Sequence, residues 1–69
     1  MDNTFPVRLR ELRKKEGLSQ RVLSELCGLN RKAVYKYEHG KAVPGMRSLR
    51  ALAKNLGVSI DELLGDPEK

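Results

Sequence analysis

Cysteine, aromatic residues and long apolar runs are scarce in this 69-residue chain. Cys27 is the single cysteine, so a disulfide within the chain is excluded, and no cysteine and histidine are spaced as metal ligands. No apolar run approaches the ~18 residues of a membrane span, and the N-terminus lacks the hydrophobic region of a signal peptide. We therefore expect a reduced, cytoplasmic protein with no metal, no cofactor and no membrane association.

Large side chains for a core are also few. Tryptophan is absent and Phe5 is the single phenylalanine, so the core must be built mainly from the eleven leucines. A chain of this length is close to the lower size at which folding needs no disulfide or metal. We expect residues 1–69 to form a single domain with frayed ends at 1–4 and 66–69 and no second domain after it. Its stability should be marginal, so dimerisation would help.

The positive charge is concentrated in the middle of the chain, which has a net charge of +5. Residues 1–17 hold five cations and three anions, residues 18–50 hold seven and two, and residues 51–69 hold two and four. A localised basic surface is typical of a protein that contacts phosphates. A charge of +5 also occurs on domains that touch no nucleic acid, so charge alone leaves both interpretations open.

The spacing of apolar residues predicts five helices and no strand. In the first helix, Phe5, Leu9 and Leu12 follow one another at i, i+4 and i+7 and so lie on one face. A fourth helix is predicted from about residue 46 to residue 56. Its buried stripe consists of Leu49, Leu52, Ala53 and Leu56.

The second, third and fifth helices share one start signal. Each begins with an apolar residue, a polar cap and a second apolar residue five positions after the first, which form a cap and a hydrophobic staple. The three caps are Ser19, Asn30 and Ser59. Gly28 permits an abrupt turn between the second and third helices. These two helices therefore form a corner that can present the third helix to a nucleic-acid groove.

Three stretches in this order and spacing make the chain similar to a known family. They are RLRELRKKEGLSQ, LCGLNRKAVYKYEHGK and PGMRSLRALAKNLGVSIDELL. The chain resembles the helix-turn-helix domains of the Cro and lambdoid phage repressor family from about residue 5 to residue 64. The resemblance implies an all-α, compact five-helix, lambda-repressor-like domain in which helices 2 and 3 form the helix-turn-helix. It also implies a sequence-specific transcriptional regulator, most simply a repressor, that reads the major groove of double-stranded DNA with the helix at about 30–38.

The resemblance assigns base readout to a few side chains of the third helix. Arg31, Lys32 and Lys36 match positions that reach base edges, and Tyr35 matches one that can touch a base edge or a phosphate. The chemistry agrees, because arginine can pair with O6 and N7 of guanine. We expect Arg31 and Lys32 in the first turn, where the helix dipole disfavours cations and a polyanion would relieve the cost. The alternative is a solvated helix face.

Phosphate contacts are implied for residues on three segments. The resemblance places Gln20 at the start of the second helix, where it touches the DNA backbone and braces the start of the recognition helix. Asn30 matches a position that can contact phosphate or a base edge. Lys41 and Arg47, around the loop into the fourth helix, lie where the family grips the adjoining phosphates.

Other residues of the two-helix corner are expected to have structural roles. Arg13 and Glu38 match an ion pair that ties the first helix to the recognition helix. Tyr37 follows the apolar stripe and should lie in the core, whereas Tyr35 should point outward. Cys27 should be a small buried apolar residue rather than a nucleophile. Because no acid, base and nucleophile can be assembled, an enzyme is not expected.

A homodimer on a pseudo-palindromic operator is the expected form on DNA. A single copy would bury little surface, and two half-sites about one helical turn apart, ~34 Å, suit a two-fold dimer. The resemblance places the contact on the fourth and fifth helices and the loop between them, with Leu64 as the residue of interest. A protein-interaction module, such as an antitoxin or an adaptor, is the alternative function.

Overall fold

The computed structural model describes residues 4–65, which form five helices. The helices are α1 (Phe5–Lys15), α2 (Gln20–Leu26), α3 (Ala33–Glu38), α4 (Met46–Leu56) and α5 (Ile60–Leu64). Within these residues the structure contains no strand, so the predicted all-α fold is confirmed. Most of the predicted frayed ends, 1–3 and 66–69, lie outside the described residues.

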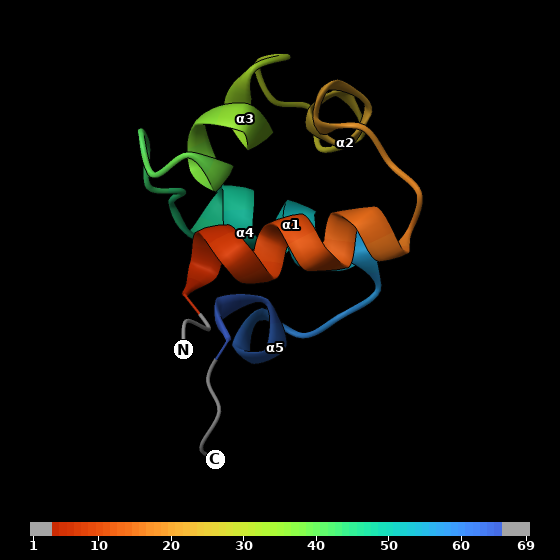
Figure 1. The fold of residues 1–69 in the computed structure, drawn as a ribbon, viewed down its shortest axis with the longest axis vertical. Helices are drawn as coiled ribbons and strands as arrows, with labels where there is room; N and C mark the ends of the chain where they lie inside the picture. The colour runs from red at the N-terminus through yellow and green to blue at the C-terminus, as the bar shows by residue number, and fades with distance from the viewer. Residues whose placement is uncertain (1–3, 66–69) are drawn as a thin grey trace.

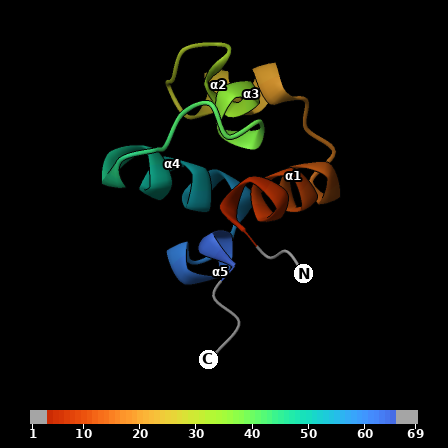
Figure 2. The ribbon, with the colours of Figure 1, turned by 60° about the vertical axis from the view of Figure 1, so that its left-hand side comes forward.

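The five helices are arranged in three levels (Figures 1 and 2). The helices α2 and α3 lie together at one end of the molecule, and α5 lies at the opposite end. Between them run α1 and α4, which therefore separate the two-helix corner from the last helix. This arrangement leaves one side of α2 and α3 free of the rest of the protein.

The core between these levels is aliphatic, as the composition predicts. All four residues of the predicted α4 stripe are buried. The aromatic rings of Phe5 and Tyr37 approach each other across α1 and α3, with centroids 6.2 Å apart. Tyr37 is buried, which confirms its predicted place in the core. The other buried apolar side chains are Leu9, Leu12, Leu23, Val34 and Leu63.

The start of α3 differs from the prediction. We expected Asn30 to cap the helix, with Arg31 and Lys32 in its first turn. The helix instead begins at Ala33, and Asn30 closes a turn before it. The Asn30 Oδ1 accepts a hydrogen bond of 2.9 Å from the Lys32 N–H, and the Asn30 carbonyl accepts one of 2.8 Å from the Ala33 N–H. An asparagine side chain that bonds two residues ahead stabilises such a turn in place of helix.

The helices α4 and α5 are joined by a short turn at Gly57. This residue adopts φ +70°, a left-handed conformation that glycine reaches without a side-chain clash. After the turn, the Ser59 hydroxyl accepts a hydrogen bond of 3.0 Å from the Glu62 N–H and so caps α5 as predicted. No helix among residues 4–65 is both long enough and apolar enough to span a bilayer.

Candidate nucleic-acid interface

A buried serine fixes the angle between α2 and α3. Ser24 is 0% exposed, and its hydroxyl donates to the Gln20 carbonyl at 2.8 Å. The same oxygen accepts a hydrogen bond of 3.0 Å from the Val34 N–H. Because the first N–H groups of a helix have no partner within it, Ser24 supplies from α2 a cap that α3 lacks. The corner is therefore held by a specific bond as well as by apolar packing.

A second bond network holds the other end of α3. The Glu38 side chain is 2% exposed and accepts hydrogen bonds from Arg13 Nε at 2.6 Å and Arg13 Nη2 at 3.1 Å. The ion pair that the resemblance implied is therefore present. Gln20 Nε2 also donates to Glu38, at 2.9 Å. Gln20 thus braces the C-terminal end of α3, whereas we expected it to brace the start.

The same network removes the negative charge of α3 from the surface. Arg13 Nη1 also donates to the Leu18 carbonyl at 2.7 Å, so one guanidinium links α1, the α1–α2 turn and α3. Glu38 is the only acid between residues 30 and 41, a segment with four cations. Since Arg13 balances its charge internally, the exposed side of α3 is electrostatically positive.

The exposed sides of α2 and α3 meet in a hollow. Its lining side chains are Gln20, Arg21, Arg31, Lys32 and Tyr35. Four of these are predicted site residues, brought together from α2, the turn before α3 and α3 itself. The sequence prediction missed Arg21. Its position next to Gln20 in the first turn of α2 is the signal that could have identified it. Arg21 also pairs with Glu25 at 3.1 Å on the surface.

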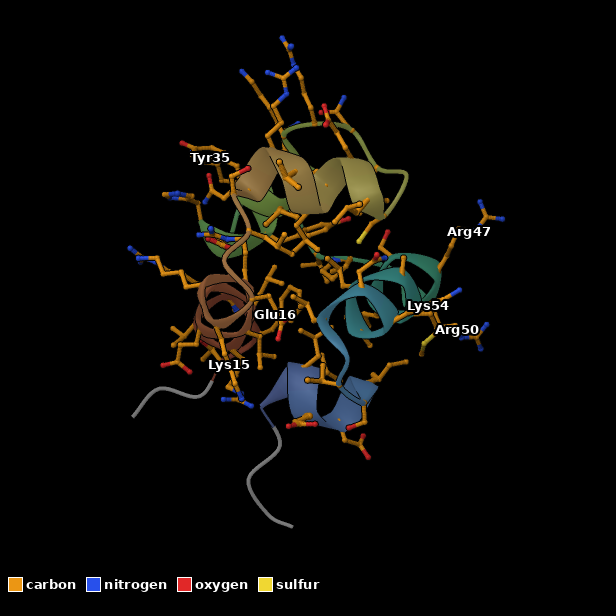
Figure 3. All side chains as sticks on the ribbon, turned by 90° about the vertical axis from the view of Figure 1, so that its right-hand side faces the viewer. Lys15, Glu16, Tyr35, Arg47, Arg50 and Lys54 are labelled. Atoms are coloured by element: carbon orange, nitrogen blue, oxygen red, sulfur yellow. The ribbon has the colours of Figure 1, made fainter. Side chains whose placement is uncertain are left out.

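Tyr35 points away from the core, as predicted. It is 40% exposed and projects from the upper part of the molecule (Figure 3). Its ring lies against that of His39, with centroids 4.2 Å apart and an angle of 34° between the ring planes. Tyr35 is thus presented at the surface with one face of its ring covered.

The remaining predicted site residues lie outside the hollow. Asn30 is exposed in the turn before α3, Lys36 is exposed on α3, and Lys41 is exposed just after it. Arg47 is exposed on α4 and projects on the other side of the view from Tyr35 (Figure 3). The structure therefore separates Arg47 from the Tyr35 group.

The described residues offer no metal site. Among residues 4–65, no three histidine, cysteine or acidic side chains gather as possible ligands. Cys27 is half-buried rather than fully buried, and burial raises the pKa of its thiol above the ordinary value of 9.0. The hydrogen bond from Asn55 Nδ2 to the Cys27 Sγ, at 3.6 Å, lowers this pKa in part. A thiol in this setting is a poor nucleophile at neutral pH.

Comparisons with known proteins match this geometry. The DNA-binding domain of the P22 C2 repressor superposes with a TM-score of 0.85 at 31% identity, covering 99% of this chain and 92% of that one. The restriction-modification controller protein C.AhdI from Aeromonas hydrophila gives a TM-score of 0.81 at 41% identity, covering 86% and 89%.

The sequence comparisons agree with the structural ones. The transcriptional regulator PuuR of Escherichia coli is 42% identical over 62 residues, which are 90% of this chain. The chain spans 34% of that relative's length. A family model described as helix-turn-helix matches residues 9–63. The corner of α2 and α3 lies within this match, and the chain belongs to the helix-turn-helix family.

Proposed function

We propose that this chain is a sequence-specific, double-stranded DNA-binding transcriptional regulator. The observation that carries the proposal is the hollow on α2 and α3, where Arg31, Lys32 and Tyr35 meet Gln20. Arg31 can donate two hydrogen bonds at once, Lys32 adds a cation, and Tyr35 adds an aromatic ring. Together on one exposed helix corner, these groups suit the donor and acceptor pattern of the major groove. The turn before α3 and the outer side of α3 would enter that groove.

The charges around α3 support contact with DNA. The ion pairs found within residues 4–65 involve Arg8, Arg13 and Arg21. Within that part of the chain, Arg31, Lys32 and Lys36 therefore have no acidic partner, and phosphates or base edges would supply one. Asn30, Lys36 and Lys41 flank the hollow and would add phosphate and base contacts. Gln20 would touch the backbone while it holds Glu38.

The proposed mode of action is repression by occupancy. A protein that covers an operator blocks polymerase without any chemistry of its own, and no catalytic role is proposed. A homodimer on a pseudo-palindrome would place two α3 helices in successive major grooves about 34 Å apart. Leu64 on α5 is 42% exposed, which suits an apolar contact between copies, and we place that contact on α4 and α5. The proposed location is the cytoplasm.

Selection of duplexes from a random pool tests the proposal directly. The full chain is incubated with the pool at physiological salt, and the bound duplexes are sequenced after several rounds. We expect enrichment of a motif with two-fold symmetry. If the pool shows no enriched sequence, the chain is not a sequence-specific regulator.

Two substitutions separate base readout from phosphate contact. Arg31→Ala should cost about 1–3 kcal/mol on the selected site and relax discrimination at one base pair. Lys41→Ala should weaken binding to all sequences and lower the salt dependence by about one ion. Lys15→Ala is the matched control, because Lys15 lies on the side of α1 away from α2 and α3 (Figure 3).

The same variants distinguish the alternative function. If Arg31→Ala and Lys41→Ala behave alike, the division into base and phosphate contacts is wrong. A partner protein whose binding survives high salt and the loss of Arg31 and Lys32 would favour an adaptor or antitoxin instead.

The proposed homodimer is tested by sedimentation of the parent chain and the Leu64→Asp variant. The variant should sediment as a monomer at concentrations where the parent chain is dimeric.

A further inference from the structure

Tyr35 and His39 form a pair on the outer side of α3. They are four residues apart, so they lie on the same side of the helix one turn from each other. Their ring centroids are 4.2 Å apart, and the His39 N–H donates to the Tyr35 carbonyl at 3.0 Å. Both side chains are exposed, and no core packing fixes either one. The rings therefore order each other.

We infer that His39 is a positioning residue for Tyr35 in DNA recognition, and that its protonated form adds a cation to the DNA-binding surface. The inference rests on the proposed function, since it concerns the same surface. It implies that the affinity for DNA depends on pH through the His39 side chain.

The positioning role follows from the place of Tyr35 in the hollow. An exposed tyrosine loses rotamer freedom when it contacts DNA, and that loss weakens binding. A ring already held against His39 has lost part of this freedom before DNA arrives. The Tyr35 ring and hydroxyl can then meet a thymine methyl or a phosphate from a set direction. Removal of the His39 ring should therefore affect both affinity and discrimination.

The charge role follows from the groups around the pair. Glu38, next to His39 on α3, is bound by Arg13 of α1 and Gln20 of α2 and is 2% exposed. It therefore offers His39 little negative charge. The other charged side chains of the surrounding segments are the cations Arg21, Arg31, Lys32, Lys36 and Lys41 and the acid Glu25, whose charge is paired with Arg21 at 3.1 Å. A phosphate backbone laid on this surface brings the missing negative charge, which favours the imidazolium form.

Protonation would also strengthen the ring contact. An imidazolium placed against the Tyr35 ring adds a cation–π attraction to the stacking of two neutral rings. The two roles therefore act in the same direction, because the protonated His39 both holds Tyr35 more firmly and attracts phosphate. DNA should therefore bind more tightly when His39 is protonated and less tightly when it is neutral.

The composition makes this dependence unusually easy to assign. His39 is the only histidine of the chain. Burial moves the Cys27 pKa further above neutrality, so this thiol does not change its charge there. The α-amino group is the other group that titrates between pH 5.5 and 8, and acetylation of the N-terminus removes it. A change in affinity across this window in the acetylated chain then reports on His39.

Fluorescence anisotropy with the selected duplex tests the inference. The acetylated chain and two variants are titrated from pH 5.5 to pH 8 at constant ionic strength. His39→Phe keeps a ring against Tyr35 without a charge, and His39→Gln removes both. Because His39 is exposed, both variants should fold, and a thermal melt followed by circular dichroism checks this.

The parent chain should bind about three- to tenfold more weakly at pH 8 than at pH 5.5, the size of one added phosphate contact. His39→Phe should lose this dependence and match the parent chain at pH 8 within about twofold. His39→Gln should also lose it, bind more weakly than His39→Phe at pH 8, and discriminate less at one base pair. A Tyr35→Leu variant should remove that discrimination in the parent chain as well.

Two results would overturn the inference. One is a pH dependence in His39→Phe equal to that of the parent chain. The other is a His39→Gln variant with the parent's affinity and base preference at pH 8. In either case the chain still binds its duplex, so the proposed function survives. Failure to enrich any duplex at the earlier step would instead refute the proposed function itself.

Discussion

The hydrogen bond from α3 to Ser24 can be tested by Ser24→Ala. The substitution removes one oxygen from a side chain that is 0% exposed. It breaks the bond from the Val34 N–H at 3.0 Å and the bond to the Gln20 carbonyl at 2.8 Å. The two losses have different consequences, because only the Val34 N–H depends on Ser24 for its partner.

The expected cost follows from these two bonds. Val34 is 0% exposed, so its N–H is left buried without a partner, which costs about 1–3 kcal/mol. The Gln20 carbonyl keeps its place in the backbone ladder of α2 and adds little. Alanine is the better helix former, which returns up to about 0.5 kcal/mol. We expect a net loss of about 1–2.5 kcal/mol, from a total of roughly 3–10 kcal/mol for a domain of this length.

Urea unfolding followed by circular dichroism at 222 nm measures the loss. Ser48→Ala is the matched control, because Ser48 is half-buried on α4 and takes part in none of the side-chain hydrogen bonds found in residues 4–65. It should change the free energy of unfolding by less than about 0.5 kcal/mol. If Ser24→Ala equals this control, the bond between Ser24 and Val34 contributes nothing to the corner and the reasoning is refuted.

Three further changes test other parts of the structure. Glu38→Gln should cost about 3 kcal/mol in urea unfolding, because it leaves the Arg13 charge partly buried without its partner; unchanged stability would contradict this. Gly57→Ala should cost about 1–2 kcal/mol in the same assay, because φ is +70° and no neighbouring atom lies within 4 Å, so the cost is backbone strain alone. Stability should also fall as pH rises above 9, because burial raises the Cys27 pKa and the unfolded chain releases that proton first. Cys27→Ala should reduce this fall, and an equal fall in both chains would exclude the thiol as its source.

Much of the fold was predictable because it depends on local patterns. The α4 helix has the bounds that its apolar stripe predicted, and the two serine caps, Ser19 and Ser59, accept the expected bonds. These signals involve residues within one or two turns of each other, so sequence spacing alone defines them. The start of α3 was less predictable. The turn that Asn30 closes competes with a helix there. Because asparagine stabilises such a turn and also caps helices, the residue type alone does not decide between the two.

Most residues of the candidate site were predicted, but the contacts between them were not. The resemblance identified Gln20 and the ion pair of Arg13 with Glu38, yet not that all three meet in one network. Arg21 was missed because its place next to Gln20 is the one signal for the hollow, while its spacing from Glu25 also fits a plain surface ion pair. Such distinctions require the relative placement of α2 and α3.

The sequence by itself determined that this chain is a small all-α domain with a basic two-helix corner. Helical periodicity, capping residues and the order of charges are properties of residues close together in the sequence. They can be recognised without knowing how the helices pack. Only the tertiary structure decided how that corner is held and which side chains it presents. Ser24 meets Val34, and Glu38 meets Arg13 across 25 positions of sequence, because helices that pack together bring distant residues within bonding range. Those contacts bury the one acid of the segment and leave its cations outside.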